Sequence, residues 1–219
     1  MLKINFTLLD QPIQIEDLTI LVIEDVIIFS QIIRQVYQYE LDGDFKIYND
    51  RYESLKSSEL VTITDIFGYD INSAGILKLI YADLEDQLNQ QPEVKSMIDK
   101  LTSTITEIIS YELIENEMDL EYDEITIQEL FKSLGIKIEV KSDTIFDKVI
   151  EIIQVFKFLT KKKLLIFINV GTYLTKKEMK YLDEYVKLNH VKLLMIEGHR
   201  VEGMPQYILD SDYYLDLDL

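Results

Sequence analysis

The sequence predicts an α/β protein whose sheet domain is built from both ends of the chain, with a helical segment inserted between them. Two continuous apolar runs, residues 164–170 and 191–196, are typical of strands buried on both faces of a parallel sheet. A helical pattern separates them, which makes a βαβ unit. Long helical patterns dominate residues 60–158. We therefore expect a discontinuous α/β domain, residues 1–59 and 159–219, and an inserted helical domain, residues 60–158.

The beginning of the chain carries strand patterns. Residues 1–9 alternate well enough to predict a strand, and residues 12–16 resemble a short partner beyond a turn. Two further strands are expected at residues 45–49 and 60–66, the second because it is rich in β-branched side chains.

The apolar run at residues 18–41 is interpreted as a helix. It contains Glu24, Asp25 and Arg34, so it is expected to be a buried helix of a globular domain and not a membrane span.

Helical spacing dominates the chain after Gly68. Ser73 is a suitable N-cap for a helix that reaches about residue 90. Pro92 suits the first position of a second helix, which extends to about residue 113. That helix carries an apolar stripe formed by Ile98, Leu101, Ile105, Ile108, Ile109 and Leu113. The remaining elements are helices at 126–134, 144–159 and 175–188, a brief extended stretch at 137–140 and a last strand at 213–217.

Composition limits the classes of function. The chain has no cysteine, so disulfides, zinc–thiolate sites and cysteine nucleophiles are excluded. Charged residues such as Lys3 and Asp10 interrupt the N-terminus, so no signal peptide is expected. We expect a soluble, cytoplasmic protein without a membrane association. The net charge of −18 argues against a general affinity for nucleic acid, although it says nothing of local patches. Of the 22 Lys and Arg residues, 14 lie from Lys132 onward.

A run of carboxylates occupies every second position from Glu115 to Asp123. It lies in a window, residues 101–131, that holds nine acidic residues and no Lys or Arg. In an extended segment these five carboxylates would project to one side and repel each other. Either solvent or a hard cation relieves that repulsion, and calcium prefers six to eight oxygen ligands. Glu124 stands where a standard EF-hand loop requires glycine, so a calcium site would be an irregular cluster. Its candidate ligands are Asp119, Glu121, Asp123 and Glu129, with contributions from Glu117 and Glu124.

Catalytic motifs are missing from the sequence. No G-x-x-x-x-G-K-[ST] motif occurs, and the strand at 164–170 carries Asn169 where a magnesium-binding Asp would be expected, so nucleotide hydrolysis is not predicted. Neither His190 nor His199 has a nucleophile or an acid at motif spacing. Glu197, His199 and Asp210 could be combined into a metal site, but nothing in their spacing demands one. We predict that the protein is not an enzyme.

The whole chain resembles the CRISPR-associated adaptation proteins of type II-A systems, the Csn-two family. The resemblance is carried by the opening strand, the split α/β domain with its helical insertion, the acidic stretch 115–129, the motif-free strand 164–170 and the ending 195–199. It implies a sheet domain of degenerate P-loop-NTPase type that has lost nucleotide binding. It also implies a homotetrameric ring, stabilised by calcium, that binds ends of double-stranded DNA without sequence preference. Such a protein supports spacer acquisition in CRISPR adaptive immunity beside the integrase and the effector nuclease, without catalysis of its own.

This resemblance suggests which cations would contact DNA. In a ring, a minority of inward-facing lysines can create a local positive field, and phosphate contacts suffice for binding that ignores sequence. Our hypothesis assigns these contacts to the lysines beside the acidic run and at the neck of the insertion: Lys132, Lys141, Lys148, Lys157, Lys161, Lys162 and Lys163.

Two other interpretations stay open at the level of sequence. One is a divalent-metal-dependent nuclease that uses the carboxylates between Glu117 and Glu129, although that segment lacks the Lys or His that usually accompanies such sites. The other is an acidic interaction module without a nucleic-acid partner.

Overall fold

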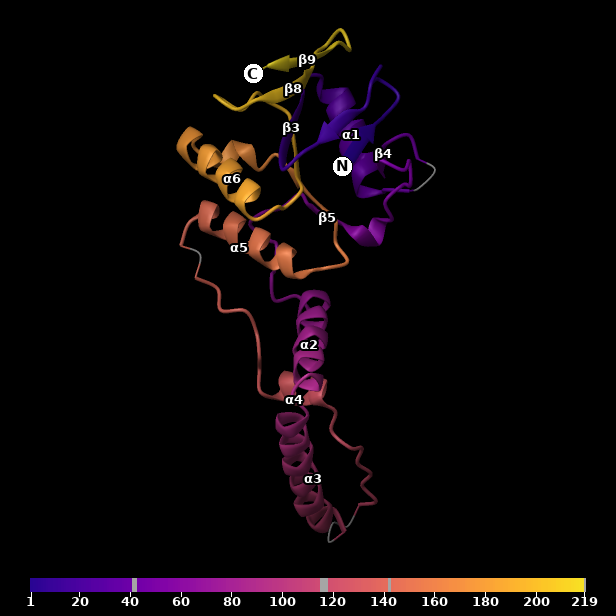
Figure 1. Cartoon of the computed structure of the whole chain (residues 1–219), viewed down its shortest axis with the longest axis vertical. Helices are drawn as coiled ribbons and strands as arrows, with labels where there is room; N and C mark the ends of the chain where they lie inside the picture. The colour runs from indigo at the N-terminus through magenta and orange to yellow at the C-terminus, as the bar shows by residue number, and fades with distance from the viewer. Residues whose placement is uncertain (41–42, 115–117, 142, 219) are drawn as a thin grey trace. The chain divides into compact units, whose positions relative to one another are not determined.

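The computed structural model describes residues 1–40, 43–114, 118–141 and 143–218. The chain folds into two compact units (Figure 1). The α/β unit comprises Met1–Tyr69 and Val140–Leu219, and the helical unit comprises Asp70–Glu139.

A six-stranded sheet forms the centre of the α/β unit, in the order β5-β6-β7-β3-β8-β9. All neighbouring strands are parallel except β8 and β9, which are antiparallel. The strands are β3 (Leu18–Ile23), β5 (Leu60–Ile63), β6 (Leu164–Ile168), β7 (Leu193–Glu197), β8 (Gln206–Leu209) and β9 (Leu215–Asp218). Every residue of β6 and β7 is buried, as expected for strands covered on both faces.

A small antiparallel sheet and three helices cover the large sheet. The small sheet has the order β2-β1-β4. These elements are β1 (Leu2–Asn5), β2 (Ile13–Ile15), β4 (Lys46–Asn49), α1 (Val26–Tyr37), α5 (Ile145–Phe158) and α6 (Lys176–Leu188). Apolar residues of α1 and the small sheet form one core cluster with alternate residues of the large sheet, among them Ile166 and Ile196. Helices α5 and α6 lie side by side on the opposite face (Figure 1).

The helical unit contains α2 (Ala74–Asn89), α3 (Pro92–Ile114) and α4 (Ile127–Ser133). Its core lies between α2 and α4, where Tyr81, Ile127 and Phe131 are buried together. The Tyr81 hydroxyl donates a hydrogen bond of 2.7 Å to the carbonyl of Ile136. No helix within the described ranges is both long enough and apolar enough to cross a membrane.

The predicted helix at 18–41 is wrong in its first part. Residues Leu18–Ile23 form β3, a strand paired with both β7 and β8, and the helix begins only at Val26. A continuous apolar run does not distinguish a buried helix from a buried central strand. The β-branched residues of this run favour the strand. The carboxylate of Asp25 then begins α1 by accepting hydrogen bonds from the backbone N–H groups of Ile27 (2.8 Å) and Ile28 (2.9 Å).

Two smaller strand predictions also need correction. Strand β8 was not expected, because its four residues carry no clear alternation. Residues 137–140 form no strand in the structure, which describes all four of them. The expected last strand at 213–217 is β9, which begins two residues later and forms the edge of the sheet.

The boundaries between the two units differ from the expected limits of 60–158. Strand β5 pairs with β6, and α5 packs beside α6, so both belong to the α/β unit. The helical unit is therefore shorter than the expected insertion. The pairing of β5 with β6 and the packing of α5 beside α6 join residues far apart in the sequence, so the local helical spacing does not reveal them.

Candidate functional site

The acidic run follows α3 directly in the helical unit. Glu115 and Glu117 lie outside the described residues. The described carboxylates of the run, Asp119, Glu121 and Asp123, are exposed and belong to no helix or strand. Glu124, beside them, is exposed as well.

Glu129 has a structural role at the start of α4. Its Oε2 atom accepts hydrogen bonds from the backbone N–H of Thr126 (2.8 Å) and from the Thr126 hydroxyl (2.7 Å), while Thr126 Oγ1 accepts from the Glu129 N–H (3.3 Å). This is a capping box. The hydrogen bond from the Thr126 side chain holds the pKa of Glu129 below its ordinary value.

The candidate metal ligands do not converge. Within the described residues, no group of three or more Asp, Glu or His side chains is placed to hold a metal ion. Oxygen donors of this kind suit calcium chemically. The described residues of a single chain do not supply the shell of ligands that calcium requires. The combination of Glu197, His199 and Asp210 forms no such group either.

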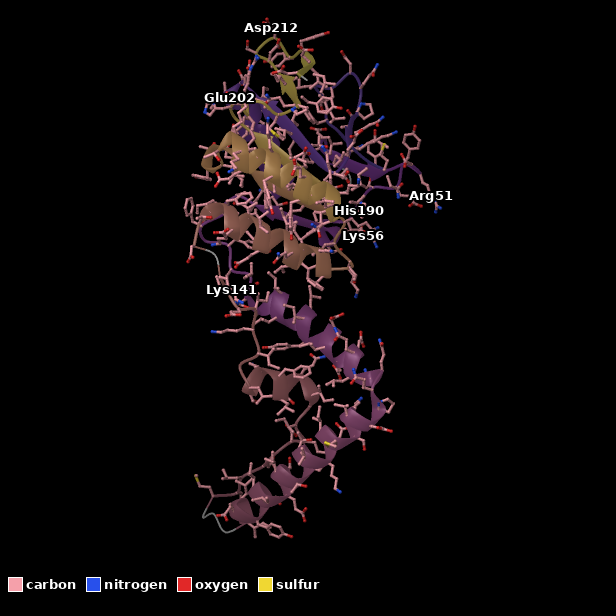
Figure 2. The ribbon with its side chains drawn as sticks, turned by 60° about the vertical axis from the view of Figure 1, so that its left-hand side comes forward. Arg51, Lys56, Lys141, His190, Glu202 and Asp212 are labelled. Atoms are coloured by element: carbon pink, nitrogen blue, oxygen red, sulfur yellow. The ribbon has the colours of Figure 1, made fainter. Side chains whose placement is uncertain are left out.

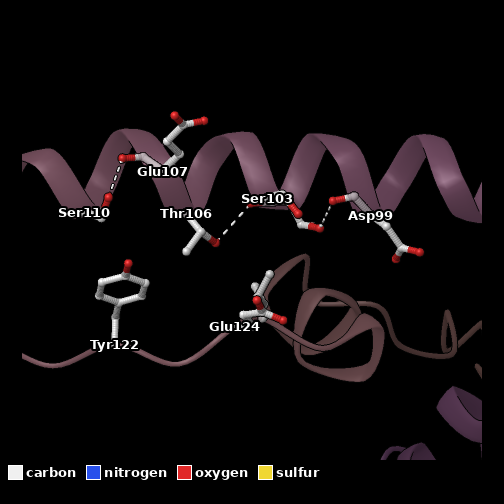
Figure 3. A pocket seen from close by; sticks show the side chains of 9 residues that line it. Asp99, Ser103, Thr106, Glu107, Ser110, Tyr122 and Glu124 are labelled. Atoms are coloured by element: carbon white, nitrogen blue, oxygen red, sulfur yellow. Dashed lines mark hydrogen bonds between the residues drawn. The ribbon is translucent and has the colours of Figure 1, made fainter.

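A polar hollow of about 370 Å³ lies between α3 and the segment after the acidic run (Figure 3). Tyr122 and Glu124 face α3 across it. The hydroxyls of Thr106 and Ser110 donate to backbone carbonyls of their own helix, at 3.0 and 2.7 Å. The hydrogen-bonding capacity of these two donors is therefore used within α3. The charged groups that line the hollow are carboxylates. The remaining lining residues are Asp99, Thr102, Ser103, Glu107 and Ile125.

Most apolar side chains of α3 are exposed, although Ile98 and Leu113 of the predicted stripe are half-buried. No residue of this helix is buried. The exposed fractions are 66% for Met97, 59% for Leu101, 54% for Ile105 and 61% for Ile108. These four residues recur at spacings of three and four, so they share one face of the helix. Large contiguous apolar patches on the surface of soluble proteins are typical of interaction sites.

The lysines predicted to contact DNA are divided between the two units. Lys132 lies on α4 in the helical unit, and the other six lie in the α/β unit (Figure 2 labels Lys141). At least four of those six have side-chain partners within the chain. Lys148 Nζ donates to the carbonyl of Phe67 (2.6 Å), Lys157 Nζ to Asn189 Oδ1 (3.0 Å) and Lys162 Nζ to the carbonyl of Leu60 (3.0 Å), while Lys163 forms an ion pair with Glu59. Lys161 is exposed.

Glu197 was considered only as a metal ligand, but its environment is unusual for a different reason. It is 2% exposed at the end of β7, and its Oε1 atom accepts a hydrogen bond of 2.8 Å from the N–H of Gly171. Burial raises its pKa to about 7, and this exceeds the opposing effect of the Gly171 and Val170 N–H groups. A side chain on Gly171 would place Cβ 3.1 Å from the carboxyl carbon. The sequence signal that could have indicated this environment is Gly171, which follows the neighbouring strand β6.

Asp25 is a second residue whose position the sequence left unassigned. It stands in the two-residue connection from β3 to α1, where no glycine-rich loop is present. Its carboxylate occupies the N-terminus of α1, which is a position that favours an anion.

Comparison with known sequences gives a consistent result over the whole chain. The profile of a family described as CRISPR-associated protein (Cas_Csn2) matches residues 38–213. A protein of Streptococcus agalactiae named CRISPR-associated protein Csn2 is 55% identical over 215 residues, which cover 98% of this chain and 97% of that protein. A protein of the same name from Enterococcus faecalis is 54% identical over 217 residues, with 99% of each chain covered.

One solved structure supports the fold alone. The crystal structure of Stu0660 of Streptococcus thermophilus matches with a TM-score of 0.60 at 11% sequence identity. The match covers 98% of this chain and 76% of that chain.

Proposed function

Because the chain belongs to the Csn2 family of CRISPR-associated proteins, we propose that it is a non-catalytic protein that binds ends of double-stranded DNA without sequence preference. In this proposal it acts in the cytoplasm as a homotetrameric ring stabilised by calcium. It supports the acquisition of new spacers beside the CRISPR integrase and effector nuclease. Its sheet is that of a P-loop NTPase that has lost nucleotide binding.

The exposed apolar side chains of α3 are the observation that supports the assembly in this proposal. Four large apolar side chains, each more than half exposed, recur along one face of a 23-residue helix. Burying such side chains stabilises an assembly by about 25 cal/mol for each Å² removed from water. A second copy of the chain offers the same apolar stripe, so closed symmetric assembly can bury both.

Calcium has a place in such an assembly because the carboxylates of one chain need neutralising. Asp119, Glu121, Asp123 and Glu124 supply hard oxygen donors without converging in a single chain. Both hydrogen bonds from Thr126 go to Oε2 of Glu129, so Oε1 of Glu129 could still bind an ion. We propose that ligands from more than one chain complete the site, with Glu117 among them.

DNA binding by so acidic a chain requires a local concentration of lysines. Contacts to phosphates alone give binding that ignores sequence, and they need only Lys and Arg. An assembly that turns the lysine-bearing surface of each copy toward a common space would produce the required field. We retain Lys132, Lys141, Lys148, Lys157, Lys161, Lys162 and Lys163 as the proposed contacts.

Light scattering on the full chain tests the assembly. With calcium we expect a mass of about 103 kDa, four times the chain mass of 25.8 kDa. A chelator should reduce that mass, and linear duplex should bind to the calcium form, whereas a closed circle of equal length should bind weakly. A mass of one chain under all conditions would contradict the ring.

Incubation of end-labelled duplex with magnesium or manganese tests the alternative nuclease. Cleavage that disappears when Asp119 and Asp123 are replaced by Asn would identify the acidic run as catalytic. The proposed function predicts intact duplex.

A further inference from the structure

The amino-terminal ends of β5, β6, β7 and β3 lie at one edge of the large sheet, because these four neighbouring strands are parallel. Seven lysines and one histidine gather at this edge from segments far apart in the sequence. We call this group the basic edge; its members are Lys56, Lys157, Lys161, Lys162, Lys163, Lys187, His190 and Lys192.

Contacts at the start of β5 connect the first of these cations. Lys162 Nζ donates to the carbonyl of Leu60 (3.0 Å), and Lys163 pairs with Glu59. Glu59 Oε2 also accepts from the backbone N–H of Lys56 (2.8 Å). The turn after α5 is therefore held against the segment that leads into β5.

Contacts at the ends of α5 and α6 connect the others. Lys157 Nζ donates to Asn189 Oδ1 (3.0 Å), and His190 follows directly at the end of α6. Lys192 forms an ion pair of 3.0 Å with Asp17, just before β3. Figure 2 labels Lys56 and His190.

The carboxylates that contact the basic edge are fewer than its cations. Lys163, Lys187 and Lys192 each pair with one carboxylate, those of Glu59, Asp183 and Asp17. The hydrogen bond to Asp183 raises the pKa of Lys187, and the charges of Asp17 and Glu16 raise it further. Within the part of the chain that the structure describes, Lys56, Lys157 and Lys161 form no ion pair. The seven lysines of the edge thus outnumber the four carboxylates that act on them, Glu16, Asp17, Glu59 and Asp183, although the chain carries −18. The negative ends of two helix dipoles account for lysines at the ends of α5 and α6. They do not account for Lys56 or Lys192, which lie in neither helix.

We propose that the basic edge is the surface on which the sugar–phosphate backbone of the DNA lies. Its phosphate contacts come from Lys56, Lys157, Lys161, Lys187, His190 and Lys192. Lys56, Lys187, His190 and Lys192 are additions to the contacts proposed above. This inference rests on the proposed DNA binding and names the surface that performs it.

Besides the phosphate contact proposed for it above, Lys162 has a positioning role at this surface. It is half-buried, and burial lowers the pKa of its ammonium group. Its hydrogen bond to the Leu60 carbonyl fixes the turn that presents Lys161.

The dimensions of the basic edge suit a duplex. Three steps of about 4.8 Å separate β5 from β3, so the edge spans about 14 Å. The major groove is about 12 Å wide, so cations at the two ends can contact phosphates on both strands across one groove.

A charge reversal on the full chain tests the inference. The variant with Lys161→Glu and Lys187→Glu is compared with a control that carries Lys177→Glu and Lys180→Glu, which are exposed residues of α6 away from the edge. Fluorescence anisotropy with a labelled linear duplex gives the affinity at salt concentrations from about 50 to about 200 mM. We expect the edge variant to bind at least about tenfold more weakly at low salt. Its slope of log affinity against log salt should fall by about 1.8, since each lost phosphate contact removes about 0.9.

The other outcomes separate this inference from the proposed function. If the wild type binds duplex and the edge variant binds it with unchanged affinity, the basic edge is not the DNA-binding surface, although the proposed DNA binding stands. Equal losses in both variants would show an effect of net charge and would also overturn the assignment of the basic edge. A wild type that does not bind would overturn both proposals. If Lys187→Glu prevents folding because it places a second carboxylate beside Asp183, the variant with Lys161→Gln and Lys187→Gln removes the same two contacts without that repulsion.

Discussion

Replacing Glu197 by Gln should remove one distinct component of the pH dependence of the stability of the α/β unit. The carboxyl is 2% exposed, and its hydrogen-bond donors include the backbone N–H groups of Gly171 and Val170. Burial raises its pKa from the ordinary 4.5 to about 7. The folded state therefore binds this proton more tightly than the unfolded state does.

The sign and size of the effect follow from this difference. Between pH 4.5 and about 7 the folded chain holds more protons than the unfolded chain, so the free energy of unfolding decreases as the pH rises. The stabilisation is complete below the unfolded pKa and is lost as the pH passes the folded pKa. At about 1.36 kcal/mol for each tenfold change in proton affinity, the loss between pH 4 and pH 8 is about 3 kcal/mol. The Glu197→Gln variant keeps an oxygen that can accept the hydrogen bond from the Gly171 N–H. Its amide group does not titrate.

Urea unfolding of both proteins at intervals from pH 5 to pH 8 measures this difference. Tyrosine fluorescence can report it, because the chain has 14 Tyr and no Trp. All other titrating groups are common to the two proteins, so the difference between their unfolding free energies isolates Glu197. That difference should shift in favour of the Gln variant as the pH rises. Glu202→Gln is a matched control, because it makes the same chemical change at a side chain that is 84% exposed. A constant difference for Glu197→Gln across this range would refute the reasoning.

Three further substitutions test other parts of the structure. Asp25→Ala removes the acceptor at the start of α1 and should lower the unfolding free energy by about 1 kcal/mol in a urea titration; an unchanged midpoint would count against the cap. Tyr81→Phe removes the bond to Ile136 and should cost about 1 kcal/mol, seen as faster amide exchange in α2 and α4 but not in the α/β unit. Ile105→Glu with Ile108→Glu should reduce the scattering mass to about 25.8 kDa with unchanged circular dichroism, since α3 has no buried residue; an intact large particle would exclude the stripe from the interface.

The parts of the fold that the sequence predicted are those with an unambiguous period. The runs at 164–170 and 191–196 are β6 and β7, and the helices beginning near Ser73, Pro92 and Thr144 lie close to the expected limits. The failure at residues 18–41 has a physical cause, because a fully buried strand and a buried helix both lack a polar face.

The candidate site was less accessible to sequence reasoning. The alternation of carboxylates in the acidic run was visible in the sequence. The groups or ions that neutralise these carboxylates cannot be read from their local spacing. Glu129 looked like a metal ligand, yet its sequence relation to Thr126 equally predicts a capping box. The basic edge brings Lys56 toward Lys163 through Glu59, across more than 100 positions of sequence. Only the pairing of parallel strands places such residues together.

The carboxylate of Asp25 at the start of α1 has a consequence for the way this helix end is stabilised. A free anion that approached it would have to displace a carboxylate tethered to the same chain and already bonded to two N–H groups. The negative charge that a helix N-terminus favours is thus supplied from within the chain. The connection from β3 to α1 therefore has an internal counter-charge that does not depend on the concentration of any dissolved ion.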